Sequence, residues 1–221
     1  MHCNLTGMCG RYALHSSPDV VAAQFGLESL PVLVPRYNIA PTTEVLIVKR
    51  DGAALARWGL VPRWSNDPSI GAKLSNARAE TLSEKHSFRD AYHRRRCLIP
   101  ANGFYEWKRQ GDLKQPYYVH PAGGELFAFA GLWETWRDLD TCTIVTTEAN
   151  AGMRAIHDRM PVIIAAEHYA GWLHGEEGLL RPALAGAIRC YPVSAAVDRA
   201  ANESPALIEP MRSEVQKSIF D

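Results

Sequence analysis

The sequence lacks several features that would assign it to a common class of protein. Its five cysteines are scattered and include no CxxC pair, which argues against a disulfide framework or a zinc knuckle and favours a reducing compartment. No stretch approaches the ~20 apolar residues that span a bilayer, and residues 1–7 have neither the basic nor the apolar region of a signal peptide. The sequence therefore predicts a cytoplasmic protein without a membrane contact.

Signatures of bound phosphates and metals are missing as well. The chain contains no GxxxxGK(S/T), no GxGxxG after a strand and no HExxH, and its eight histidines are dispersed. We therefore expect neither a metal ion nor a cofactor. Lys and Arg number 24, as do Asp and Glu, so a contact with nucleic acid has to come from a local basic patch.

Strand patterns dominate what is present. Residues 44–49 and 54–58 are β-type runs that flank Asp51-Gly52, a strong signal for a hairpin. Further strands are predicted at residues 97–99, 103–108, 117–120, 126–130 and 141–147, with turn-rich pieces between several of them.

Predicted helices are few and short. Ser17, Pro18 and Gly26 supply the cap, the first residue and the stop of a helix over residues 18–25, and other helices are predicted at 79–85, 89–94 and 165–173. A chain of 221 residues that is 47% hydrophobic indicates one domain. These patterns predict an α+β fold with a curled, mainly antiparallel and barrel-like sheet and with helices packed at its edges.

Cys9 stands directly after Met8. Translation from Met8, or removal of the residues before Cys9, would place an amine and a thiol on one N-terminal residue. The α-amine of such a cysteine condenses with an aldehyde, and the thiolate then closes a five-membered thiazolidine; both groups are partly nucleophilic near neutral pH. The alternative for a lone Met-Cys-Gly is a buried cysteine behind a leader segment.

Three polar residues occur in apolar or Gly/Pro-rich surroundings, where loops on a rigid sheet commonly carry function. Asn76 precedes a predicted helix and is either its N-cap or a catalytic amide. Glu106 lies between aromatic residues on a predicted strand; packed among them it would have a raised pKa and donate a proton, whereas strand alternation also allows an exposed glutamate. His157 is either a structural histidine or a proton shuttle whose ring Asp158 or Thr146 orients.

Two further segments, residues 35–42 and 58–64, interleave arginine, aromatic residues and proline, a mixture that suits a single strand of nucleic acid. We expect Trp58 in the core and Trp64 on the surface. The run His93-Arg94-Arg95-Arg96 is typical of a solvated face, with phosphate contacts as the alternative. Arg159 would be a phosphate ligand if His157 faces a nucleic-acid groove.

Six motifs together resemble the SRAP family (SOS response-associated peptidase). They occur in the order of the family pattern and span most of the chain from Met8. The motifs are Met8-Cys9-Gly10-Arg11-Tyr12, Arg36-Tyr37-Asn38-Ile39-Ala40-Pro41, Trp58-Gly59-Leu60-Val61-Pro62, Asn76-Ala77-Arg78-Ala79-Glu80, Gly103-Phe104-Tyr105-Glu106-Trp107 and Ile156-His157-Asp158-Arg159-Met160-Pro161.

This resemblance implies one SRAP domain over residues 8–221, with residues 1–7 a leader that is absent from or removed in the active form. It implies a protein that binds single-stranded DNA at abasic sites and crosslinks to them through a thiazolidine on Cys9, with lyase-like Schiff-base chemistry and self-cleavage as the proposed peptidase activity. We expect such a protein to act as a monomer in the DNA damage (SOS) response, in the cytoplasm at the nucleoid and replication fork.

The resemblance also implies roles for individual residues. Cys9 would be the nucleophile, Asn76 would position its amine or thiol, Glu106 would act as acid and base in ring opening and closure, and His157 would assist formation and reversal of the Schiff base. Phosphate ligands would be Arg11, Arg78 and Arg159, and the path of the strand would be lined by Asn38, Pro41 and Trp64.

Two other hypotheses remain open. In an N-terminal-nucleophile cysteine peptidase or amidohydrolase, Cys9 would attack an amide, with His157 or Glu106 as base. In a non-catalytic module that binds single strands, Cys9 would be incidental and its replacement by alanine would leave binding unchanged.

Overall fold

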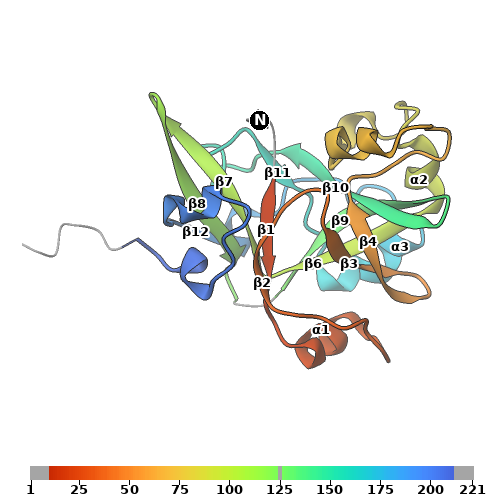
Figure 1. Cartoon of the computed structure of the whole chain (residues 1–221), viewed down its shortest axis with the longest axis horizontal. Coiled ribbons are helices and arrows are strands. Elements are labelled where there is room, and N and C mark those ends of the chain that lie inside the picture. Colours follow the sequence, from red (N-terminus) through yellow and green to blue (C-terminus); the bar gives the residue numbers. More distant parts are fainter. Residues whose placement is uncertain (1–9, 124–125, 212–221) are drawn as a thin grey trace, which may run out of the picture.

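The computed structural model describes residues 10–123 and 126–211, so Cys9 and the predicted leader lie outside the described residues. Its strands form two sheets (Figure 1). They are β1 (Arg11–Leu14), β2 (Arg36–Ile39), β3 (Glu44–Lys49), β4 (Gly52–Trp58), β5 (Asn76–Arg78), β6 (Arg96–Ala101), β7 (Gly103–Gln110), β8 (Leu113–Pro121), β9 (Phe127–Trp136), β10 (Leu139–Glu148), β11 (Arg159–Pro161) and β12 (Ile188–Pro192).

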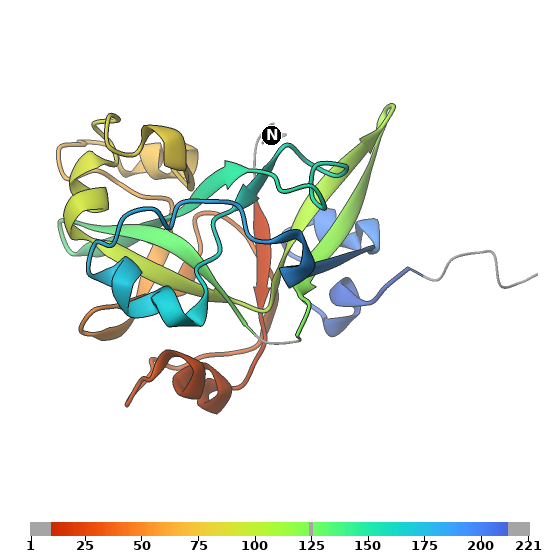
Figure 2. The ribbon, with the colours of Figure 1, turned by 180° about the vertical axis from the view of Figure 1, so that it is seen from behind.

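Helices are short. The α-helices are α1 (Pro18–Phe25), α2 (Arg89–Arg94) and α3 (Tyr169–Leu173), and the 3-10 helices are η1 (Pro68–Lys73), η2 (Ala79–Thr81), η3 (Ala166–His168), η4 (Ala185–Ala187), η5 (Ala195–Asp198) and η6 (Pro205–Ile208). In Figure 2, α3 lies against the barrel strands, well away from the hairpin of β7 and β8.

One of the sheets closes into a barrel. Strand β10 pairs with β4 in parallel and with β9 antiparallel, and the antiparallel pairings β4–β3, β3–β6 and β6–β9 complete the ring. Two short strands extend beyond this ring: β5 lies parallel to residues 144–146 of β10, and β11 lies antiparallel to residues 146–148. The last part of β10 is therefore held between β5 and β11.

The second sheet has the strand order β12-β8-β7-β1-β2 and is antiparallel throughout. One of its faces packs against the barrel, where the ring of Tyr12 makes edge contacts with Trp58 and Phe129 at centroid distances of 5.3 and 6.0 Å. Its other face carries Ala13 and Tyr105 and packs against the chain around Val197 and Leu207. A third cluster of buried side chains joins α2 and α3 to β6 and β9.

The predicted α+β fold with a barrel-like sheet is confirmed. The Asp51-Gly52 signal gives the β3–β4 hairpin, and helix α1 has its predicted cap, because the Ser17 side chain accepts from the amide of Val20 and Gly26 adopts a left-handed φ of 63°.

The helix predicted over residues 79–85 is wrong, since it forms only the 3-10 turn η2. The amides of Leu82 and Glu84 donate to carbonyls three residues earlier, at Ala79 and Thr81, so the segment continues as turns. Leu82 is buried in the cluster that joins α2 and α3 to the barrel, a tertiary contact that the local sequence does not show.

Candidate functional site

Strand β5 places two of the predicted site residues at the end of the barrel. Asn76 lies opposite Ile144 of β10, and Arg78 lies opposite Thr146. Because side chains alternate along a strand, both face the side of Ile144, which belongs to the core shared with the second sheet, whereas Ala77 faces the helix-covered side. Asn76 is half-buried and Arg78 is exposed.

The structure does not use Asn76 as a helix cap. The 3-10 turn that follows β5 has Arg78 at its cap position and no side-chain capping bond. Asn76 is instead a strand residue beside Ser75, whose carbonyl accepts from the indole of Trp58 at 2.7 Å. Since Trp58 also contacts Tyr12 of β1, the start of β5 is tied to the second sheet.

Glu106 lies on the face of β7 that looks toward the barrel. Its neighbours Tyr105 and Trp107 face the other way, where the Trp107 indole donates to Asp198 at 2.7 Å, and Phe104, two residues away, lies in the shared core. The side chain is only 3% exposed. The alternative of an exposed strand glutamate is therefore wrong, and the carboxyl group lies buried on the barrel-facing side of β7.

His157 follows a tight turn and precedes β11. Its Nδ1 accepts from the backbone amide of Arg159 at 3.0 Å and lies 3.1 Å from Oδ1 of Asp158. These contacts, together with a side chain that is 24% exposed, fix one ring nitrogen inside the protein. The other ring nitrogen is the one that can act on a substrate. Of the two orienting residues suggested by the sequence, Asp158 contacts the ring.

Arg159 makes a two-pronged contact with Glu80. Its Nη1 and Nη2 donate to the two carboxylate oxygens at 2.6 and 2.9 Å, and Nη2 also donates to the carbonyl of Thr146 at 2.9 Å. The hydrogen bond from Arg159 is the main reason that the pKa of Glu80 is lowered. The predicted phosphate ligand is thus engaged by a carboxylate of the protein itself.

Arg11 and Asn38 lie on the opposite face of the second sheet from Tyr12. Arg11 Nη1 donates to Asn38 Oδ1 at 2.8 Å and to the carbonyl of Val197 at 2.7 Å. Burial lowers the pKa of the Arg11 guanidinium from its ordinary value, although the negative charge of Asp198 acts to raise it. Asn38 is 2% exposed. Its amide donates to backbone carbonyls at Val197, Arg199 and Asn202, so the contacts seen for Asn38 are with the protein's own chain.

Pro41 and Trp64 lie in loops. Pro41 is partly exposed and precedes Thr42, whose φ is 72°. Trp64 is 50% exposed and stacks on His86 with ring centroids 5.1 Å apart. The expectations that Trp64 is exposed and that Trp58 lies in the core are both confirmed, since Trp58 has no exposed surface.

The basic run at residues 93–96 is only partly solvated. His93 and Arg94 are exposed, but Arg96 is 6% exposed and its guanidinium lies between the rings of Tyr92 and Trp172 at 4.4 and 4.5 Å. The prediction of a solvated face is therefore wrong for Arg96, because two aromatic rings and backbone carbonyls replace its water.

Together, Asn76, Arg78, His157 and Arg159 gather around the end of β10, and Glu106 lies buried on the facing side of the second sheet. Arg11 and Asn38 face away from this core. Glu80 stands two residues after Arg78, but no local pattern indicates a role for it, because its partner Arg159 is 79 residues away in the chain.

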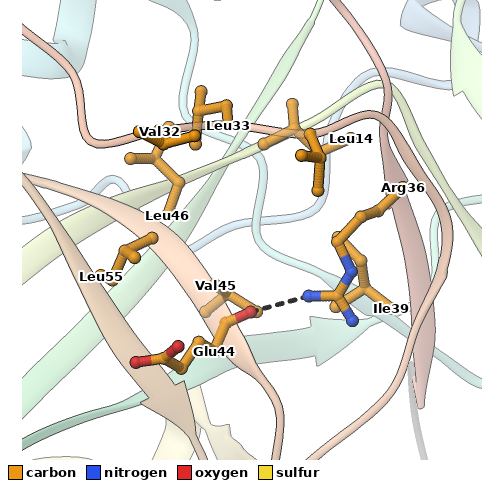
Figure 3. Close-up of a pocket in the computed structure, with 10 residues that line it drawn as sticks. Leu14, Val32, Leu33, Arg36, Ile39, Glu44, Val45, Leu46 and Leu55 are labelled. Atoms are coloured by element: carbon orange, nitrogen blue, oxygen red, sulfur yellow. Dashed lines mark hydrogen bonds between the residues drawn. The ribbon is translucent and has the colours of Figure 1, made fainter.

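An apolar cavity of about 140 Å³ lies elsewhere, between the segment before β2 and the β3–β4 hairpin. In Figure 3 its wall includes Leu14, Leu46 and Leu55, while Arg36 donates to the carbonyl of Glu44 at 2.8 Å. It contains none of the predicted site residues. Across residues 10–123 and 126–211, no group of three or more His, Cys, Asp or Glu residues is arranged to hold a metal ion, and no helix there is long and apolar enough to cross a membrane.

Comparison with known proteins identifies the class. A family model described as SOS response associated peptidase (SRAP) matches residues 8–200. The chain belongs to the SRAP family, as its motifs predicted.

The similarity to individual relatives extends over almost their whole length. The chain is 44% identical to the abasic site processing protein YoqW of Bacillus subtilis, over 91% of this chain and 99% of that protein. It is 30% identical to the abasic site processing protein YedK of Escherichia coli, over 92% and 100%. A crystal structure of a protein from Bacteroides thetaiotaomicron matches with a TM-score of 0.85 and 26% identity, over 92% of this chain and 100% of that one.

Proposed function

We propose that this protein processes abasic sites in single-stranded DNA by forming a covalent thiazolidine crosslink through Cys9. The observation that carries the proposal is its similarity along nearly the whole chain to proteins named for abasic site processing. The geometry supports it, because a buried carboxyl, a strand amide and an oriented histidine occupy the facing sides of the two sheets.

The chemistry requires Cys9 to have a free α-amine. Translation from Met8 followed by removal of the methionine would provide it, as would self-cleavage of the leader, and the match to the family model begins at residue 8. The amine attacks the ring-opened sugar aldehyde and water is lost, which gives a Schiff base. The thiolate then attacks the imine carbon, and the nitrogen takes up a proton to complete the thiazolidine. The balance is aldehyde plus aminothiol giving thiazolidine plus water.

Each polar residue takes a separate part in this sequence. Glu106 is buried on the barrel-facing side of β7, where a carboxyl group can exchange protons with the opening sugar ring and the departing water. Asn76 positions the amine or the thiol of Cys9, and His157, whose Nδ1 is held by the amide of Arg159, assists formation and reversal of the Schiff base through its other ring nitrogen. The Schiff base is also the intermediate from which a lyase reaction would proceed.

The DNA strand would be held by charge and by stacking. Arg78 is exposed beside the site and can reach a phosphate directly, and Arg159 lies on β11, on the other side of β10. Arg11 lies on the far face of β1, and the buried Asn38 would act by holding it. Pro41 and the half-exposed Trp64 supply surfaces on which bases can stack. We expect the protein to bind as a monomer, in the DNA damage response at the nucleoid.

The test is intact mass spectrometry of the mature protein before and after incubation with a single-stranded oligonucleotide that carries one abasic site. We expect a chain that begins at Cys9 to gain the mass of the oligonucleotide less one water. Cys9→Ala should form no heat-stable adduct, whereas Cys190→Ala, a matched control at an exposed cysteine, should react like the wild type. Glu106→Gln should slow the reaction by about 100-fold or more, the usual effect of losing an acid–base group.

Other results would overturn the proposal. Mature protein that binds the oligonucleotide without gaining mass, with Cys9→Ala binding equally well, would indicate a non-catalytic module. Cleavage of a peptide or amide that depends on Cys9, without an adduct, would indicate a cysteine hydrolase.

A further inference from the structure

The ion pair between Glu80 and Arg159 is more than a surface contact. The side chain of Arg159 is only 14% exposed, while that of Glu80 is 49% exposed. Both terminal nitrogens of the guanidinium donate hydrogen bonds to the carboxylate, and Nη2 also donates to the carbonyl of Thr146. Two-pronged contacts of this kind fix the plane of the guanidinium as well as its position.

The same contact reaches His157 through the backbone. The amide of Arg159 donates to Nδ1 of His157 at 3.0 Å, and Arg159 lies opposite Glu148 in the pairing of β11 with β10. A shift of Arg159 would therefore move the group that orients the imidazole. Glu80 itself belongs to η2, directly after β5, so the ion pair connects the segment of Asn76 with the segment of His157.

The ion pair also limits what Arg159 can offer to a phosphate. A guanidinium has five N–H donors. Three of them point at Glu80 and Thr146, and Nε is buried without a hydrogen-bond partner among the described residues. One N–H of Nη1 remains. The carboxylate of Glu80 also neutralises the charge of Arg159 and stands two residues from the exposed Arg78, where it repels an approaching phosphate.

We propose that Glu80 is a positioning residue, which holds Arg159 and through it His157 in the geometry needed for crosslinking while it weakens the binding of DNA. The inference rests on the proposed function, because it assigns Glu80 to the same reaction. It predicts that binding and reaction respond in opposite directions when the carboxylate is removed. A residue with a merely structural role would impair both.

The experiment compares the wild type with Glu80→Gln, which keeps the shape of the side chain and removes its charge. Glu84→Gln is the matched control, since Glu84 is an exposed glutamate on the turn that follows. Binding is measured with an undamaged single-stranded oligonucleotide at several salt concentrations. Reaction is measured as the single-turnover rate of adduct formation at saturating abasic DNA.

For Glu80→Gln we expect the Kd for the undamaged oligonucleotide to fall about three-fold. The slope of log Kd against log salt concentration should increase by about the amount expected for one more phosphate contact. The crosslinking rate at saturation should fall roughly ten-fold, as expected when reacting groups lose their alignment. Glu80→Asp, which keeps the charge on a shorter side chain, should recover part of the rate. Glu84→Gln should leave the rate unchanged.

An unchanged rate in Glu80→Gln, or a loss of both binding and rate that Glu80→Asp does not relieve, would overturn the positioning role and leave the proposed function intact. Failure of the mature wild type to form an adduct would instead overturn the proposed function. The two failures are therefore distinguished within one set of measurements.

Discussion

The carboxylates of Glu134 and Glu80 each bind arginine, but in one pair the carboxylate is the buried partner and in the other the arginine is. Glu134 of β9 has a side chain that is 6% exposed and is bound by Arg63, which is 63% exposed, and by Arg95, which is 13% exposed. In the other pair the carboxylate of Glu80 is 49% exposed and the arginine is the buried partner. The buried carboxylate of Glu134 is therefore bound by two arginines, whereas the buried guanidinium of Arg159 is bound by one exposed carboxylate and by the backbone carbonyl of Thr146.

The two clusters connect different parts of the molecule. Glu134 joins the residue after α2 and the loop after β4 to a barrel strand, at 2.6 and 2.7 Å, so its loss leaves a buried cation without its charge partner. Glu80 joins two segments of the candidate site, and its carboxylate remains in contact with water. We therefore expect the first cluster to determine stability and the second to tune the site.

The largest effect should follow Glu134→Gln, which removes the buried charge and keeps the shape of the side chain. Breaking a buried ion pair by removing one partner costs about 3 kcal/mol or more of unfolding free energy. Glu80→Gln should cost under about 1 kcal/mol, as is typical of a pair with one exposed partner. Urea unfolding at constant m-value measures both. Equal losses in the two variants would show that burial of the carboxylate does not separate the clusters.

A smaller effect should separate the two arginines that bind Glu134. Arg95→Met and Arg63→Met both keep the aliphatic stem and remove the charge. We expect a loss of about 2 kcal/mol for the mostly buried Arg95, and under about 1 kcal/mol for the exposed Arg63, whose pairing is screened by water. Thermal unfolding checks the order, and a larger loss for Arg63 would contradict it.

The smallest effect should appear on acidification. The pKa of Glu80 is lowered from 4.5 by its bond to Arg159, so its contribution to stability is fully present above about pH 4.5 and is lost as the pH falls through the lowered value. The difference in stability between the wild type and Glu80→Gln should therefore be constant near neutral pH and shrink below about pH 4.5. Chemical unfolding from pH 7 to 3 measures it. A difference that grows toward low pH would contradict the ion pair.

Elements with local signals could be predicted from the sequence. The Asp51-Gly52 hairpin and the capped helix α1 depend on residues that are close neighbours, and both are present. The helix expected at residues 79–85 is replaced by turns, and Leu82 within it is buried against strands that are distant in the chain. A solvated face was expected for Arg96 because Trp172, whose ring packs on the Arg96 guanidinium, is 76 residues away in the chain.

The same distinction holds for the candidate site. The family, and the motifs that carry Asn76, Glu106 and His157, could be predicted from the sequence because each motif is a short run of residues. The direction in which these side chains face, and the pairing of Arg11 and Arg159 with groups of the protein, depend on the tertiary structure. Arg11 meets Val197 across 186 residues, and Arg159 meets Glu80 across 79. Such contacts follow from how strands pair and pack, and the pairing of distant strands leaves no signal in a local stretch of sequence.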